Sequence, residues 1–278
     1  MNAVNIVGSF LGGCIGAMVG GNPAFIIVGI IGVVFLAMGN APGASLLQST
    51  IEYTLFTPCI CFSGNVAALA YAANIRKYEG INGTDLNKAL GFTQDFSVLM
   101  VGGVFGILGF LNLNLVMYLK LPLDAGAFTV VILGILVRLL FGHAKFINPK
   151  LKEVSLFNKG DGKEWAYKIM AGFVVACVAS YAASISGKAT IGFYFSALSL
   201  IFLLLDGDFP VTHHVSIIAG YASVRSGNVL IGILFGVLAS IVFELYQNTI
   251  NSNVDSHIDA PACTIATFSL IIFCMYPA

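Results

Sequence analysis

Long apolar runs separated by short polar stretches make up most of the chain. A helix needs about twenty apolar residues to cross a bilayer, and fewer where it is short or broken. On this criterion the pattern predicts ten transmembrane helices and therefore an all-α integral membrane protein. The ten segments cover residues 3–20, 23–39, 55–74, 96–118, 122–142, 167–186, 189–206, 209–224, 227–247 and 260–277.

Composition supports this interpretation and narrows the functional classes. Hydrophobic residues make up 58% of the chain and charged residues 9%, whereas soluble domains carry about 25% charged residues. The formal net charge is zero, which gives no reason to expect a nucleic-acid partner. The chain contains no HExxH, no GxSxG and no glycine-rich loop ending in GK[ST], so we expect neither an enzyme nor an ATP-driven motor, and no cofactor.

The first five apolar segments resemble the last five in order. Asp124-Ala125 precedes the fifth segment as Asp259-Ala260 precedes the tenth, and two further pairs of short matches occur in the same order. Those pairs are 69–72 with 219–222 and 105–108 with 235–238. Since five is an odd number of crossings, the second repeat is expected to be inverted, as in many secondary transporters. The predicted domains are a first five-helix repeat at 1–144, a basic linker at 145–166 and a second five-helix repeat at 167–278.

Basic residues orient the predicted spans. They concentrate in the loop after the third segment and in the linker, and the positive-inside rule places both in the cytoplasm. These residues are Arg76, Lys77, Lys88, Lys145, Lys150, Lys152, Lys159 and Lys163. With ten spans, both termini are then expected outside the cell membrane, which in a bacterium is the inner membrane. Arg138, near the end of the fifth segment, is expected to snorkel to the interface.

Glycine recurs every four residues in the first segment, at Gly8, Gly12, Gly16 and Gly20. Small residues on one helical face let backbones approach closely in lipid. The pattern indicates close helix packing within the chain, with the seam of a homo-oligomer as the alternative.

The third and eighth segments are interrupted by proline and polar residues at matching places. Such breaks are the best sequence indication of a transporter binding site, because a broken helix presents free N–H and C=O groups. The candidate site residues here are Thr57, Ser63, Asn65, Thr212, His213 and Ser216. The alternative is that these are ordinary spans whose polar residues lie at the water interface. His213 and His214 point about 100° apart on a helix, so only one can readily face a given site.

The stretch before the tenth segment adds His257, Asp259 and Thr264, and Asp124 is the counterpart of Asp259. Placing an ionisable group in the membrane costs about 2.5–3.5 kcal/mol on insertion scales. Each such residue is therefore expected to have a structural or functional role. Asp259 and Asp124 are candidates for binding a coupling ion, H⁺ or Na⁺. The alternative is that they cap helices, as expected for Asp95 before the fourth segment. A metal site formed by His213, His257 and Asp259 is a lesser alternative.

Together these features predict an ion-coupled secondary transporter, such as a symporter, for a small polar or ionic solute. Its site would lie at the repeat interface and work by alternating access. The expected partners are membrane lipid and the small-molecule or ion substrate. Two alternatives remain: a facilitative channel, and a membrane subunit that anchors a larger complex through the basic linker.

Overall fold

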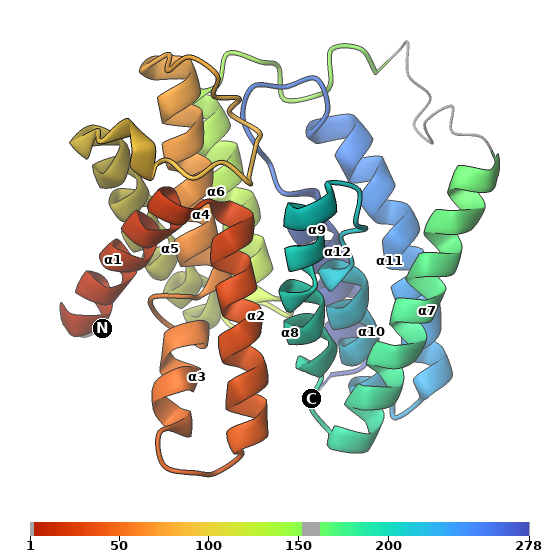
Figure 1. The fold of residues 1–278 in the computed structure, drawn as a ribbon. Coiled ribbons are helices and arrows are strands. Elements are labelled where there is room, and N and C mark those ends of the chain that lie inside the picture. The colour runs from red at the N-terminus through yellow and green to blue at the C-terminus, as the bar shows by residue number, and fades with distance from the viewer. Residues whose placement is uncertain (1–2, 152–161, 278) are drawn as a thin grey trace. The chain divides into compact units, whose positions relative to one another are not determined.

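A computed structural model describes residues 3–151 and 162–277, and within these residues it contains helices and turns but no strand (Figure 1). Five helices are long and apolar enough to cross a membrane, which is compatible with a membrane protein. They span Gly21–Met38, Pro58–Ile75, Phe96–Tyr118, Gly162–Ser186 and Val229–Ile250. Four shorter apolar helical stretches lie at Ala3–Val19, Ala125–Phe141, Ile191–Asp206 and Ala260–Met275. The prediction of an all-helical, strongly apolar chain is therefore confirmed for the described residues.

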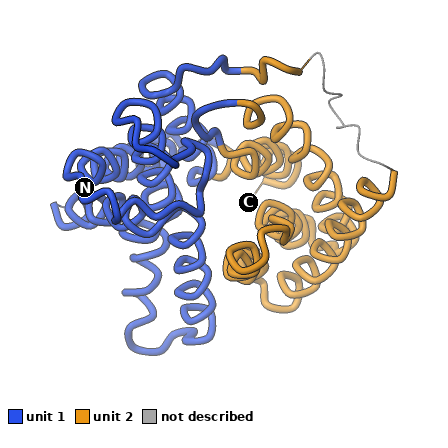
Figure 2. The backbone as a smooth tube through the Cα atoms, turned by 45° about the horizontal axis from the view of Figure 1, so that its top comes forward, with its two compact units in different colours: residues 1–121, 125–146, 254–258 blue, residues 122–124, 147–253, 259–278 orange. Residues whose placement is uncertain are grey.

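The chain forms two compact units that do not follow a simple division of the sequence (Figure 2). Unit 1 contains residues 1–121 and 125–146 together with the short segment 254–258. Unit 2 contains residues 147–253 and 259–278 together with residues 122–124. Each unit thus includes a few residues that stand directly before the last helix of the opposite half.

Unit 1 is built around three helices in mutual contact: α1 (Ala3–Val19), α4 (Pro58–Ala70) and α5 (Phe96–Tyr118). The helix α6 (Ala125–Phe141) packs on α4 and α5, and α2 (Gly21–Met38) packs on α4. A short helix, α3 (Ala44–Glu52), lies beside α2 (Figure 1). This leaves α4 enclosed by its neighbours.

Glycines allow α1, α4 and α5 to approach at backbone distance. A side chain on Gly13 would collide with the Gly102 carbonyl, and one on Gly16 would collide with the Cys61 carbonyl. By contrast, a methyl group on Gly8 would meet Thr54 at an ordinary 3.6 Å. The prediction that this glycine pattern serves close packing is confirmed for Gly16.

Unit 2 repeats the same order of helices and the same set of contacts. Here α7 (Gly162–Ser186), α10 (His213–Ser226) and α11 (Val229–Ile250) are in mutual contact, and α12 (Ala260–Met275) packs on α10 and α11. The helix α8 (Ile191–Leu198) packs on α10 and α7 and continues into α9 (Leu200–Asp206). In packing terms α7, α8, α10, α11 and α12 therefore correspond to α1, α2, α4, α5 and α6.

Several helix boundaries differ from the sequence prediction. The helix α3 lies between two predicted spans, in a stretch too polar to be recognised by hydrophobicity alone. The predicted seventh span divides into α8 and α9 at Ser199. The helix α7 begins at Gly162, so the last residues of the predicted linker 145–166 are helical. Lys152 and Lys159 of that linker lie outside the described residues.

Asp95 caps α5, as predicted. Its carboxylate accepts hydrogen bonds from the Ser97 hydroxyl at 2.7 Å, the Ser97 amide at 2.7 Å, the Tyr78 hydroxyl at 2.9 Å and Arg76 Nε at 2.7 Å. The Ser97 hydroxyl bond, followed by the other hydrogen bonds and the charge of Arg76, holds the pKa of Asp95 well below its ordinary value. The ionised form is thus specifically stabilised in the folded chain.

This cap gives a pH-dependent prediction for Asp95→Asn. A carboxyl whose pKa is lowered by folding adds stability above its unfolded pKa of about 3.9, and loses it as pH falls towards the folded pKa. Asparagine keeps the capping acceptor but not the charge. We expect the variant to have a lower Tm than the wild type at pH ~6 and a shrinking difference below pH ~4. Thermal unfolding in detergent at a series of pH values measures this, and a constant difference would contradict it.

Candidate functional site: two short buried helices

The helices α4 and α10, with 13 and 14 residues, are the enclosed members of their units, and a π-helical turn at Tyr71–Ile75 continues α4. Every residue of α4 from Cys59 to Ala70 is buried. It follows Thr57, whose backbone is extended, and has proline in its first turn. In unit 2, residues 208–212 before α10 are likewise non-helical, and α10 is buried from His213 to Gly220. The helix starts therefore lie next to non-helical backbone, as the interrupted sequence pattern predicts.

Three polar side chains on or before α4 are buried without a hydrogen-bond partner among the described residues. They are the hydroxyls of Thr57 and Ser63 and both amide atoms of Asn65. Asn65 is 0% exposed. Its Oδ1 lies against the first residue of α2, since a methyl group built on Gly21 would meet that atom at 2.9 Å. All three are predicted site residues, and all belong to unit 1.

His214 is the corresponding buried polar group of α10. It is 1% exposed, and neither ring nitrogen has a hydrogen-bond partner within residues 3–151 and 162–277. Its ring stacks on Phe243 of α11, with centroids 4.4 Å apart and planes at 28°. The sequence analysis selected His213 instead. Two adjacent histidines carry no signal for which one faces the core, because that depends on how α10 packs on α11.

Three further candidates of unit 2, Asp259, Ser216 and Thr264, already make hydrogen bonds. The Asp259 carboxylate accepts a hydrogen bond from the Ala262 amide at 2.8 Å and caps α12, so the cap interpretation is confirmed. Asp259 also interacts electrostatically with His213, which is buried in the first turn of α10. The hydroxyls of Ser216 and Thr264 donate to carbonyls of their own helices, at 3.0 and 2.9 Å.

Asp124 and Asp259, paired by sequence, use their carboxylates differently. Asp124 accepts a 2.6 Å hydrogen bond from the Tyr221 hydroxyl of α10. Its backbone N–H donates to the Ser269 hydroxyl of α12 at 2.8 Å. Asp124 thus belongs to unit 2 through residues of α10 and α12, although it directly precedes α6 in the sequence.

The segment 254–258 is held in unit 1 by Arg138, whose predicted role was wrong. Arg138 is 2% exposed and does not snorkel to the surface. Its guanidinium donates to the Ser256 hydroxyl at 3.1 Å, to the Ser256 carbonyl and to the Phe146 carbonyl at 3.1 Å. Asp255 accepts from the backbone amides of His143 and Ala144. A long basic side chain near a helix end did not reveal this role, because its partner Ser256 lies 118 residues away in the sequence.

Arg138 thereby fixes the position of His257. The His257 ring is buried and lies edge-on to Phe62 of α4, with ring centroids 6.0 Å apart. His257 therefore belongs to unit 1 with Thr57, Ser63 and Asn65. The candidates of unit 2 are Asp124, Thr212, His213, Ser216, Asp259 and Thr264.

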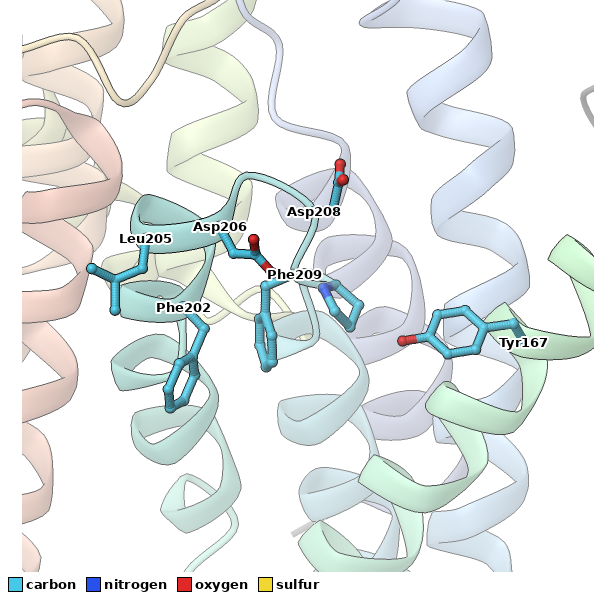
Figure 3. Close-up of a pocket in the computed structure, with 7 residues that line it drawn as sticks. Tyr167, Phe202, Leu205, Asp206, Asp208 and Phe209 are labelled. Atoms are coloured by element: carbon cyan, nitrogen blue, oxygen red, sulfur yellow. The ribbon is translucent and has the colours of Figure 1, made fainter.

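Unit 2 also has an open cavity of about 440 Å³ beside the segment leading to α10 (Figure 3). Its lining residues are Tyr167, Phe202, Leu205, Asp206, Asp208, Phe209 and Pro210. The Asp208 carboxylate points away from the aromatic rings (Figure 3). None of the predicted site residues lines this cavity. Within the described part of the chain, no group of three or more His, Cys, Asp or Glu residues could hold a metal ion.

The sequence of the chain matches a known protein family. The model of a family of unknown function, DUF7973, matches residues 1–158 and again residues 159–278. The chain belongs to this family. The two matches divide the sequence between α6 and α7, so each contains one of the two corresponding sets of helices. No curated protein and no solved structure matches the chain.

Proposed function

We propose that the protein is an ion-coupled secondary transporter of a small polar or ionic solute. The observation that carries the proposal is the pair of enclosed helices α4 and α10, on which polar side chains are buried without a hydrogen-bond partner among the described residues. Leaving a buried donor or acceptor unpaired costs about 1–3 kcal/mol. Such a cost at matching helices of two similarly packed units is typical of groups kept for binding a ligand.

The duplication supports an inverted-repeat architecture. One family model matches both halves, and corresponding helices make corresponding contacts. The described residues hold nine apolar helical stretches, five before α7 and four from α7 onwards, and α10 would supply the tenth crossing. Five crossings per half would invert the second repeat relative to the first. The ten spans would then place the basic loops in the cytoplasm and both termini outside the cell membrane. Alternating access would arise from movement of one repeat against the other.

Asp259 is the leading candidate for sensing the coupling ion, H⁺ or Na⁺. It is a buried carboxylate at the start of α12, and it interacts with the buried His213. A helix start stabilises a carboxylate, while an arriving cation would reduce the cost of keeping that charge buried. Asp124, hydrogen-bonded to Tyr221, is its sequence counterpart.

Asp259→Asn tests the proposal. Asparagine is as good a helix cap as aspartate, so the variant is expected to fold. Its ion-driven uptake is expected to fall about tenfold or more, as loss of a coupling free energy of about 1–3 kcal/mol implies. The measurement is uptake of radiolabelled small solutes by proteoliposomes, with and without an imposed H⁺ or Na⁺ gradient.

Asp95→Asn is the matched control, because Asp95 also caps a helix but is not a candidate site residue. It is expected to keep wild-type uptake. Wild-type uptake that ignores both gradients would favour a facilitative channel. Full gradient-driven uptake by Asp259→Asn would remove Asp259 from the coupling mechanism.

A further inference from the structure

Asn65 and His214 carry the same hydrogen-bonding chemistry. A carboxamide has an acceptor oxygen and a donor NH₂ group, and a neutral imidazole has one N–H donor and one bare acceptor nitrogen. Both side chains are essentially fully buried, and neither has a partner among the residues that the structure describes. The helices α4 and α10 thus each bury an uncharged side chain that has both a donor and an acceptor, in addition to the Thr57 and Ser63 hydroxyls of unit 1.

Each of the two groups also lies at the start of a helix. The Oδ1 atom of Asn65 is placed against Gly21, the first residue of the 18-residue helix α2. His214 lies in the first turn of α10. The first N–H groups of any helix have no partner within that helix. At the start of α2, the Asn22 and Ala24 amides already donate to the Leu86 and Gly20 carbonyls and Pro23 has no N–H, so a backbone donor beside Asn65 is limited to Gly21.

The helices of unit 1 around Asn65 either carry no charged residue or carry one that is already bound to other groups. The helices α1, α2, α4 and α5 contain no Asp, Glu, Lys, Arg or His. On α6, Arg138 is bound to Ser256 and Phe146. Other titratable groups of unit 1 are His257, edge-on to Phe62, and the buried thiols of Cys59 and Cys61 on α4. No full charge on α1, α2, α4 or α5 is therefore available to balance a charged solute.

The charges packed around α10 are engaged as well. Lys168 of α7 pairs with Glu164 and with Glu244 of α11, at 2.9 and 3.0 Å. At the far end of α10, Arg225 donates to the Tyr276 carbonyl and covers the Phe273 ring. Asp259 of α12 caps its helix and interacts with His213, and Cys263 follows it on the same helix. The helix α8 carries no charged residue.

From this juxtaposition we propose that Asn65 and His214 each bind a small neutral solute whose donor and acceptor are bonded to the same carbon, as in a primary amide. This rests on the proposed transport function and specifies its solute. The solute's carbonyl accepts from the helix start or the side-chain donor, and its N–H donates to Asn65 Oδ1 or to the bare imidazole nitrogen. An anion of the same size would instead place an acceptor oxygen against Asn65 Oδ1 or against the bare imidazole nitrogen, where no hydrogen bond can form.

The test compares three solutes of similar size and different charge: acetamide, acetate and methylammonium. Thermal unfolding of the purified full chain in detergent is followed with each solute at equal concentration, with NaCl as the salt control. We expect acetamide alone to raise the Tm, by about 5 °C at ~100-fold excess over its dissociation constant. Acetate and methylammonium are expected to act like NaCl.

Two variants that keep the approximate shape of the side chain test whether the rise in Tm with acetamide arises at Asn65 and His214. Asn65→Val and His214→Phe are each expected to reduce the acetamide shift, and the double variant is expected to abolish it. Without acetamide, both variants are expected to have Tm values at or above the wild type, because each removes unpaired buried polar atoms. A merely structural role for these side chains would lower the Tm. Asn114→Leu is the control, since the Asn114 amide already donates to Phe110 of its own helix.

A rise in Tm with acetate or methylammonium, no rise with acetamide, or an acetamide shift that survives in the double variant would each overturn the proposal. These outcomes are separable from failure of the transport proposal. An acetamide shift without gradient-driven flux would support the binding inference and contradict coupled transport. Gradient-driven flux of a charged solute, with no acetamide shift, would support coupled transport and contradict the binding inference.

Discussion

Replacing Gly16 with alanine is expected to destabilise unit 1 more than any other single methyl group added to α1. The new Cβ would overlap the Cys61 carbonyl of α4, which is backbone and therefore unable to swing aside. The two helices would have to separate along their contact. Overpacking of this kind costs about 3 kcal/mol at the upper end of its usual range. The predicted result is a large fall in Tm and in the yield of monodisperse protein.

Gly8→Ala provides the control in the same helix and the same glycine series. The added methyl would meet Thr54 at 3.6 Å, an ordinary contact. Since alanine favours a helix over glycine by about 0.5–1 kcal/mol, this variant is expected to match or exceed the wild-type Tm. Thermal unfolding in detergent and size-exclusion profiles measure both variants. Similar Tm values for the two would show that α1 and α4 do not meet at Gly16.

The second large effect is expected at Arg138. Arg138→Met keeps the length of the side chain but removes every donor to Ser256 and Phe146. It also leaves the nearby Asp255 without the opposite charge that faces it. Removing one partner of a buried charged network costs about 3–5 kcal/mol. We therefore expect a strongly lowered Tm and faster proteolysis at residues 254–258.

Arg225→Met is the comparison for this substitution. Arg225 makes one hydrogen bond, to the Tyr276 carbonyl, and covers the Phe273 ring, but it is only partly buried. A hydrogen bond from a charged group contributes about 1.5–3 kcal/mol at most, so a smaller loss is expected. Limited proteolysis followed by mass spectrometry distinguishes the two, because only Arg138→Met should expose 254–258. Equal protection of that segment in both variants would contradict the assigned role.

Hydrophobic length and helix-start chemistry predicted much of the fold. Apolar runs located α5 and α11 closely, and Asp95 marked the start of α5. The helix α3 was missed because its sequence is too polar to form an apolar run. The division of the seventh span at Ser199 was missed because a single serine inside an apolar stretch is no clear stop signal.

The candidate site was predictable only in part. Thr57, Ser63 and Asn65 were found from the broken third segment, and they are buried without a hydrogen-bond partner among the residues that the structure describes. His214 was missed because its burial is decided by stacking on Phe243, 29 residues further along the chain (243 − 214). The role of Arg138 was wrong for a similar reason. Sequence patterns reveal periodicity within one helix, but not which distant carbonyl a side chain reaches.

The placement of residues 254–258 in unit 1 has a consequence for biosynthesis. The Arg138 guanidinium and the Asn74 amide receive their partners Ser256 and Asp255 only when that segment has been made, about a hundred residues after α6. Unit 1 therefore stays incomplete on the ribosome until the chain is nearly finished. If the gene were divided between α6 and α7, the first fragment would lack residues 254–258 and could complete unit 1 only with the second fragment. Such fragments would be expected to mature only when both are produced in the same cell.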